Sequence, residues 1–266
     1  DHLVDADLAG HGSHGVQRLP QYLEMVRQNA VRLGAPLTIL AQQGQLVRTS
    51  GNWNFGPVTA AAAVRLAIAR AQDHVAAVVT VRDCNHVSSL GPIAALATAE
   101  RMIGIIAANG HGGDLAVAPS GGRGRRLATN PLCVAVPTAR PWPVVVDLAT
   151  SAASGGQLRL WRDQGQPAPP GVLLDARGAA TCDVAAYYGS PAGALRPLGA
   201  PEQAHKGFGL AMLLDVLAGA LSGAGCSRAA AERSGHALLV AVPRVEAFQP
   251  WPRFAERQWE VQLSRE

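Results

Sequence analysis

The chain has 266 residues, of which 48% are hydrophobic, 16% charged and 5% aromatic, and its formal net charge is +4. This apolar content is enough for a large core and excludes a disordered or fibrous chain. The modest charge and the few aromatic residues argue against nucleic-acid binding, and no apolar run reaches the roughly 18 residues of a membrane span. The four cysteines form no C-x-x-C pair and no signal peptide is visible, so we expect reduced thiols and a cytoplasmic protein without a membrane partner.

Helical and strand patterns alternate along the first half of the chain. Apolar spacing predicts helices at 19–31, 56–74 and 90–100. Short apolar runs predict a hairpin near 40–47 and buried strands at 75–81, 102–109, 132–137, 143–148 and 236–242. The Gly- and Pro-rich stretch 154–200 predicts loops with short strands, and residues 206–225 predict a buried helix that ends in glycines. This order predicts an α/β fold with a mixed sheet and flanking helices, and no clear domain boundary.

Three glycines near the start match a dinucleotide-binding pattern. Gly10, Gly12 and Gly15 fit G-x-G-x-x-G. A Rossmann loop also needs a strand before the glycines and an acidic residue about 20 positions after them. Here the preceding apolar residues have helical spacing, and the stretch 27–36 holds no acidic residue. We therefore expect a fold other than Rossmann and look for function in the side chains between the glycines.

A first set of polar residues follows those glycines. His14, Arg18 and Tyr22 are four residues apart, so that on a helix they would share one face. Histidine exchanges a proton near neutral pH, and the arginine fork matches a carboxylate. Together with Ser13 they suit a site that holds a small carboxylate beside a proton-transfer group. The alternative is a capped helix start with Ser13 as the N-cap.

Two further sets flank predicted strands. Asn85 and His86 follow the buried strand 75–81, at the end where ligands bind in open α/β sheets. The stretches 127–131 and 147–151 offer Thr and Ser hydroxyls and turn N–H groups that could contact phosphate or ribose. For each set the alternative is an ordinary turn without ligand contact.

Two remaining observations concern metal ligands and lysine. His11, His14, His86 and His111 could supply nitrogen ligands, but no acidic residue has metal-site spacing, so we predict no metal. Lys206 is the only lysine among 23 basic residues and opens an apolar helix. Because lysine and arginine differ in donor geometry, we expect this ammonium to be functional rather than a chance surface residue.

The motifs together resemble a known family. Five motifs follow one another along the chain, namely SHGVQR at 13–18, NH at 85–86 with LG at 90–91, ATNP at 128–131, VDLATS at 146–151 and HKGFGLA at 205–211. This order is similar to that of the type-2 malate/L-lactate dehydrogenase family, which is NAD(P)-dependent and unrelated to the Rossmann dehydrogenases. The similarity runs from about Asp5 to Arg228 and is strongest to the bacterial 2-hydroxycarboxylate dehydrogenase branch.

The resemblance implies a non-Rossmann α/β fold and a homodimer with its site near the subunit interface. The chain would form one catalytic unit of interleaved lobes. Residues of about 1–50, with the C-terminal part, would form a substrate and dimer lobe, and about 51–225 a cofactor-binding lobe. One of His14 and His86 would be the proton donor. Substrate-binding residues would be Ser13, Arg18, Tyr22, Asn85, Thr129 and Asn130. Residues that bind NAD or NADP would be Ser88, Ser89, Leu90, Asp147, Leu148, Ala149, Thr150, Ser151, His205 and Lys206.

The expected activity is hydride transfer between NAD(P)H and a small 2-oxo or 2-hydroxy carboxylic acid. Relatives place a Gly-Lys or, in imino-acid reductases, a Gly-Asp pair where this chain has Gly156-Gln157. The missing charge weakens the alternative of a cyclic imino-acid reductase and allows an unusual substrate. A second alternative, from another class, is a catalytically silent cofactor-binding protein.

Overall fold

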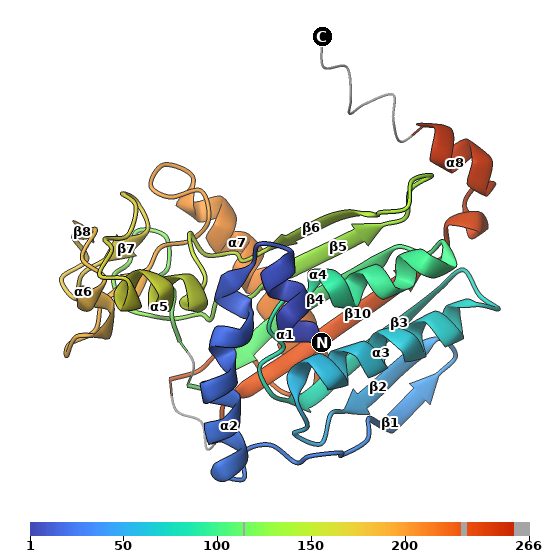
Figure 1. Cartoon of the computed structure of the whole chain (residues 1–266), viewed down its shortest axis with the longest axis horizontal. Coiled ribbons are helices and arrows are strands. Elements are labelled where there is room, and N and C mark those ends of the chain that lie inside the picture. The colour runs from blue at the N-terminus through green and yellow to red at the C-terminus, as the bar shows by residue number, and fades with distance from the viewer. Residues whose placement is uncertain (114, 230–232, 258–266) are drawn as a thin grey trace.

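The computed structural model describes residues 1–113, 115–229 and 233–257. In this part of the chain seven strands form one mixed sheet in the order β1-β2-β3-β10-β4-β5-β6 (Figure 1). The strands are β1 (Thr38–Gln43), β2 (Leu46–Ser50), β3 (Ala76–Cys84), β4 (Gly104–His111), β5 (Leu132–Val136), β6 (Val144–Leu148) and β10 (Gly235–Pro243). Strands β2 and β3 pair in parallel, and the other neighbouring pairs are antiparallel. The predicted mixed α/β sheet and the hairpin near 40–47 are confirmed.

Helices cover both faces of this sheet. On β4, Ile106 and Ala108 point into the main apolar core together with the buried alanines of α3 (Gly56–Ala71), which are Ala60, Ala63, Ala67 and Ala71. The alternate residue Asn109 faces the other side, where its Nδ2 donates to Asp215 beyond the end of α7 (Ala204–Leu214). Because successive side chains on a strand point to opposite faces, α3 and α7 lie on opposite sides of the sheet. The predicted helix 56–74 is confirmed as α3, which ends three residues earlier.

The predicted buried helix 206–225 is only half-buried. The helix α7 passes into a π-helical turn at Asp215–Ala220, and the glycines that follow have positive φ at Gly223 and Gly225. Met212 and Leu213 on the outer side are about half exposed, 50% and 53%. The expectation of full burial was wrong because the helix forms an outer layer on the sheet, with one face turned away from it.

Strand β6 differs in the same way from the buried strand predicted at 143–148. It is the last strand of the sheet, and Val145 and Val146 are exposed. An edge strand has a neighbour on one side only, so an apolar run does not guarantee burial. The inner strands β3, β4 and β10 are buried as expected.

The remaining helices are shorter than the sequence predicts. Helix α2 covers Leu19–Arg27 instead of 19–31. The stretch 90–100 is one turn of α-helix, α4 (Gly91–Ala94), followed by a 3₁₀ helix at Ala95–Glu100. Two helices lie near the ends of the described chain, α1 (His2–Leu8) and α8 (Trp251–Arg257). Of the helices in the described ranges, none is long and apolar enough to cross a membrane.

The stretch 154–200 forms a small layer beside the main sheet (Figure 1). Its short strands are β7 (Leu173–Leu174), β8 (Ala180–Thr181) and β9 (Ala194–Leu195), and its short helix is α6 (Ala185–Tyr188). Helix α5 (Gly155–Asp163) was not predicted, and it begins where Ser154 Oγ accepts a hydrogen bond from Gln157 N, 3.1 Å away. This layer has its own apolar cluster around Leu158, distinct from the core under the main sheet.

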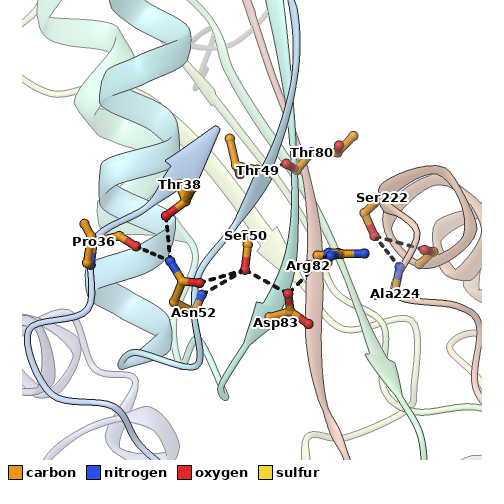
Figure 2. A network of polar contacts seen from close by, with 11 residues as sticks. Pro36, Thr38, Thr49, Ser50, Asn52, Thr80, Arg82, Asp83, Ser222 and Ala224 are labelled. Carbon is orange, nitrogen blue, oxygen red and sulfur yellow. Dashed lines mark hydrogen bonds and ion pairs between the residues drawn. The ribbon is translucent and has the colours of Figure 1, made fainter. Parts of the chain in front are cut away.

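A polar network holds the chain after β2 against the end of β3 (Figure 2). Ser50 Oγ donates to Asp83 Oδ2 over 2.8 Å, and Asn52 Nδ2 donates to Thr38 Oγ1 over 2.8 Å. Asn52 and Asp83 both have left-handed φ, +49° and +53°, and these bonds offset that strain. The network therefore fixes the strand end from which Asn85 and His86 emerge.

Candidate active site

A cavity of about 800 Å³ lies where the ends of β3, β4 and β10 meet the small layer. It brings together most of the side chains that the sequence singled out. The predicted residues in its lining are Ser13, His14, Arg18, His86, Ser88, Ser89, Thr129, Asp147, Ala149 and Ser151. Lining residues that the sequence analysis missed include Gln21, Gly110, Arg125, Arg159, Arg162, Tyr187, Tyr188 and His236.

His14 and Arg18 reach the cavity without sharing a helix. They end two separate 3₁₀ turns, Gly12–His14 and Val16–Arg18, which are divided by an extended Gly15. A Cβ at Gly15 would collide with the Asp7 carboxylate, whose Oδ2 accepts a hydrogen bond from Val16 N over 2.9 Å. The prediction of one continuous helical face was therefore wrong. The glycine makes room for the Asp7 carboxylate, which fixes the loop.

The two predicted histidines face each other across the cavity. The rings of His14 and His86 are nearly parallel, with 6.4 Å between their centroids. Ser13 Oγ lies 2.9 Å from His14 Nδ1, and Tyr22 Oη lies 3.2 Å from His86 Nδ1. Since each Nδ1 has a partner, Nε2 is the nitrogen of each ring that a ligand in the cavity can approach. A third ring, His236, packs edge-on against His86 with 5.1 Å between centroids.

Burial keeps both imidazoles neutral. Desolvation, together with the nearby charge of the Arg18 guanidinium, lowers the pKa of His14 from 6.5 to about 4. Desolvation also lowers the pKa of His86 well below its usual value, with His236 and Arg18 acting in the same direction. A neutral imidazole can accept a proton, so either ring is able to act as a general base toward a bound hydroxyl.

Arg18 is buried, with 4% of its surface exposed, and is held at several points. Its Nε donates to Ser13 O and its Nη1 to Gln21 Oε1, each over 3.0 Å. A Cβ at Gly156 would lie 2.6 Å from Arg18 Nη2 and would collide with Ser13 O. The start of α5 thus packs directly against the loop that carries His14 and Arg18. A preorganised guanidinium beside neutral imidazoles suits the binding of a carboxylate.

The motifs at 88–91 and 147–151 are joined through Asp147. Asp147 Oδ2 accepts hydrogen bonds from Leu90 N, over 2.9 Å, and Gly91 N, over 2.8 Å, at the start of α4. Ser89 Oγ donates to the same oxygen. Ser88 Oγ donates to the backbone oxygen of His14 over 2.8 Å and so ties this turn to the histidine loop.

Several predicted site residues lie outside the cavity lining and support its walls. Asn85 Nδ2 donates to the backbone oxygens of Trp53 and Asn54, and Asn130 Oδ1 accepts from Gly110 N. Thr150 Oγ1 donates to the backbone oxygens of Thr129 and Asn130. The predicted residues outside the lining are Tyr22, Asn85, Leu90, Asn130, Leu148, Thr150, His205 and Lys206. Asn85, Asn130 and Thr150 thus have backbone partners, and their predicted contacts with substrate or cofactor stay predictions.

Lys206 and its neighbour His205 are exposed at the start of α7. The next residue, Gly207, lies against the backbone of Leu198, and Leu198 N donates to Thr150 O over 2.9 Å. The helix start therefore lies close behind the 149–151 segment. A contact between Lys206 and a cofactor stays a prediction. Within the described residues, no cluster of three or more His, Cys, Asp or Glu is arranged to hold a metal ion.

A comparison with protein families decides the identity of this arrangement. The family model described as malate/L-lactate dehydrogenase matches residues 1–261. The chain belongs to this family. The family expected from the ordered motifs is thereby confirmed, together with the non-Rossmann mixed α/β fold.

Individual members of the malate/L-lactate dehydrogenase family agree with this assignment. The chain is 36% identical to an L-lactate dehydrogenase of Cupriavidus necator, over 85% of this chain and 64% of that protein. It is 38% identical to an L-sulfolactate dehydrogenase of Methanothermobacter thermautotrophicus, over 84% of this chain and 62% of that protein. The solved malate dehydrogenase of Pyrococcus horikoshii has a TM-score of 0.85 at 31% identity, covering 99% of this chain and 74% of that chain. The chain thus spans less than two thirds of the length of these two curated relatives.

Proposed function

We propose that the protein to which this chain belongs is an oxidoreductase that interconverts a small 2-hydroxy acid and its 2-oxo acid with NAD or NADP. The observation that carries the proposal is one cavity in which a buried Arg18 lies beside two neutral imidazoles, His14 and His86. The dehydrogenase names of the relatives, which include L-lactate and L-sulfolactate, support the same chemistry.

Residues of this chain would bind the substrate and transfer its proton. The Arg18 fork holds the substrate carboxylate and so fixes the adjacent carbon. The Nε2 atom of His14 or of His86 takes the hydroxyl proton during oxidation and returns it during reduction. His14 is the better candidate, because the same loop carries Arg18. The Nε atom of Arg18 donates to the backbone oxygen of Ser13, the residue before His14.

The cavity also has the size and lining for part of a nicotinamide cofactor. Its volume of about 800 Å³ lies within the range of small-molecule sites. From the histidines it continues past hydroxyls and a carboxylate at Ser88, Ser89, Asp147 and Ser151. These residues would hold the cofactor, which when bound would supply the hydride. The proposal covers either NAD or NADP as the cofactor, and it includes a contact between Lys206 and this cofactor.

A homodimer is also part of this proposal. Leu8, Val16, Leu19 and Leu23 on and between α1 and α2 are exposed, and a cluster of exposed apolar side chains is typical of an interaction surface. Sedimentation or light scattering of the purified protein would give its mass. A monomer at all concentrations would contradict the dimer and leave the reaction untouched.

A substrate panel tests the reaction itself. The protein is mixed with NADH or NADPH and with 2-oxo acids, and with a cyclic imine such as a pyrroline carboxylate, while cofactor oxidation is followed by absorbance. We expect turnover of 2-oxo acids. Turnover of the imine alone would favour an imino-acid reductase, and cofactor binding without any turnover would identify a silent cofactor-binding protein.

A further inference from the structure

Three arginines lie close together in the loop between β4 and β5, and the structure separates them. Arg123, Arg125 and Arg126 belong to the segment 121–126. Arg123 and Arg126 are exposed, whereas Arg125 is half-buried and lines the cavity. In a loop that met only solvent, all three charged side chains would be exposed. Arg125 is therefore placed for a contact inside the cavity.

The Arg125 guanidinium is held in one orientation. Its Nε donates to Gly193 O over 2.7 Å, its Nη2 donates to Tyr187 O, and its Cζ lies 3.9 Å from the centre of the Tyr187 ring. Two of the five N–H groups of an arginine are thereby used, and both acceptors are neutral backbone oxygens. Among the described residues, no carboxylate lies within ion-pair distance of Arg125. A fixed guanidinium with further donors and a charge that none of these carboxylates offsets suits the binding of an anion.

Aromatic rings adjoin this guanidinium. Tyr187 and Tyr188, at the end of α6, meet edge to face with 5.2 Å between their centroids. The guanidinium of Arg162 lies 4.8 Å from the centre of the Tyr188 ring, and its charge is already paired with Asp163. Both tyrosines and both arginines line the cavity. Tyrosine rings and guanidinium planes are surfaces on which a nucleotide base stacks.

This wall lies at the other end of α5 from the proton-transfer groups. Gly156, near the start of the helix, packs against Arg18, and Arg162, near its end, packs against Tyr188. The helix advances about 9 Å between these two positions. Figure 1 shows α5 between α1 and α6. A small 2-oxo acid held by Arg18 is therefore too short to reach Arg125, whereas a dinucleotide that starts at the histidines is long enough.

We propose that Arg125 binds the 2′-phosphate of NADP(H), so that the protein selects this cofactor over NAD(H). The inference rests on the proposed function and names its cofactor. The two cofactors differ only in this phosphate, at the adenosine end, and the guanidinium fork matches its oxygens. In Rossmann enzymes, NAD sites place a carboxylate at the ribose 2′-hydroxyl and NADP sites place an arginine at the phosphate. The same chemistry on this fold makes Arg125 a specificity-determining residue, with Tyr187 and Tyr188 beside the adenine ring.

The test measures the dissociation constants of NADPH and NADH, by the fluorescence of the reduced nicotinamide, in the wild type, Arg125→Gln and Arg126→Gln. We expect the wild type to bind NADPH about 10- to 100-fold more tightly than NADH, the scale of one charge-assisted contact. Arg125→Gln should lose this preference by weakening NADPH alone. Arg126→Gln removes the same charge from the neighbouring position outside the lining and should leave both constants unchanged.

A second measurement needs no variant and so does not depend on the folding of Arg125→Gln. It compares the rise in melting temperature of the wild type with adenosine 2′,5′-bisphosphate and with 5′-AMP, which lacks the 2′-phosphate. The bisphosphate should raise the melting temperature more, because a ligand that binds the native state more tightly stabilises it more. Equal rises with the two nucleotides would overturn the inference.

The remaining outcomes separate the cofactor site from the proposed reaction. Equal weakening of NADPH and NADH in Arg125→Gln would place Arg125 at the cofactor diphosphate and overturn the inference. Turnover of a 2-oxo acid with the same kcat/KM for NADH and NADPH would also overturn it and leave the reaction intact. An NADPH preference that Arg125→Gln removes, in a protein that turns over no 2-oxo acid, would support the inference and contradict the reaction.

Discussion

Tyr22 and His86 are 64 positions apart in the sequence, and the Tyr22 hydroxyl lies 3.2 Å from His86 Nδ1. The phenol also packs against the ring of Phe55, with 5.6 Å between centroids. This pair fixes the orientation of the imidazole, because one ring nitrogen is held by the hydroxyl and the other is left toward the cavity. We therefore expect Tyr22 to act as a positioning residue, and its predicted contact with the substrate stays a prediction.

Removal of this hydroxyl is the first prediction. Tyr22→Phe keeps the ring packing and loses one hydrogen bond, worth about 1 kcal/mol. We expect turnover of the 2-oxo acid to fall by roughly tenfold, because a freely rotating imidazole is less often aligned for proton transfer. The pH–rate profile should shift in its acid limb, where the buried imidazole takes up a proton, while cofactor affinity is constant. An unchanged profile with unchanged turnover would show that the bond has no functional role.

The second prediction separates the two histidines. His14→Ala should lower turnover by about 10²- to 10⁴-fold, the usual contribution of general acid–base catalysis, and should still bind the reduced cofactor. His86→Ala should lose less. The pH–rate profile of each variant is the decisive measurement. If the acid limb disappears in His86→Ala and persists in His14→Ala, the two roles are exchanged.

Arg18 gives the third prediction. Arg18→Lys keeps the charge but replaces a planar fork by a point charge, so the bonds to Ser13 O and Gln21 Oε1 cannot both be kept. We expect a loss of about 1.5–3 kcal/mol in binding the 2-oxo acid, with nearly constant cofactor affinity. Steady-state kinetics with each substrate varied in turn measures both. If the lysine variant has the same kinetic constants as the wild type, Arg18 does not bind the substrate and serves only in packing.

Two adjacent glycines at the start of α5 give the fourth prediction. Gly156→Ala would place a Cβ in collision with Ser13 O and 2.6 Å from Arg18 Nη2, so it should destabilise the protein by about 1–3 kcal/mol and lower activity. At Gly155 an added Cβ meets nothing within 4 Å, and Gly155→Ala should be neutral or slightly stabilising. Denaturant unfolding of both variants is the measurement. Equal stability of the two would contradict the close packing of α5 against the histidine loop.

The fifth prediction concerns acid. The pKa of His14 is lowered from 6.5 to about 4 in the folded protein, so the unfolded chain binds its proton first as the pH falls. The contribution of His14 to the free energy of unfolding is therefore fully present above about pH 6.5. It declines by up to about 3 kcal/mol as the pH falls from about 6.5 to about 4. His86, whose pKa is also lowered, adds in the same direction. The test measures the free energy of unfolding of the wild type and of His14→Gln at about pH 7 and about pH 5. The loss of stability between the two pH values should be smaller in the variant. An identical loss of stability at low pH in the two proteins would contradict this prediction.

The sequence by itself determined the elements whose signal is local. Apolar runs located β3, β4 and β10, and a long alanine-rich stretch after Gly56 located α3, because burial on a sheet requires continuous apolar side chains. The ordered motifs were enough to predict the family and to select His14, Arg18 and His86, which the fold does bring into one cavity. These residues could be selected because their side-chain types suit proton transfer and carboxylate binding.

Only the tertiary structure decided which residues meet. Nothing in the local pattern of α5 links Arg159 to Gln21, or in that of α2 links Tyr22 to His86, since each pair joins elements far apart in the chain. Burial was also a tertiary property. The apolar run of β6 became an exposed edge and half of α7 faces outward, because periodicity reports the character of a side chain and not what packs against it. The backbone partners of the Asn85 and Asn130 amides are tertiary in the same way, because only folding brought them within reach.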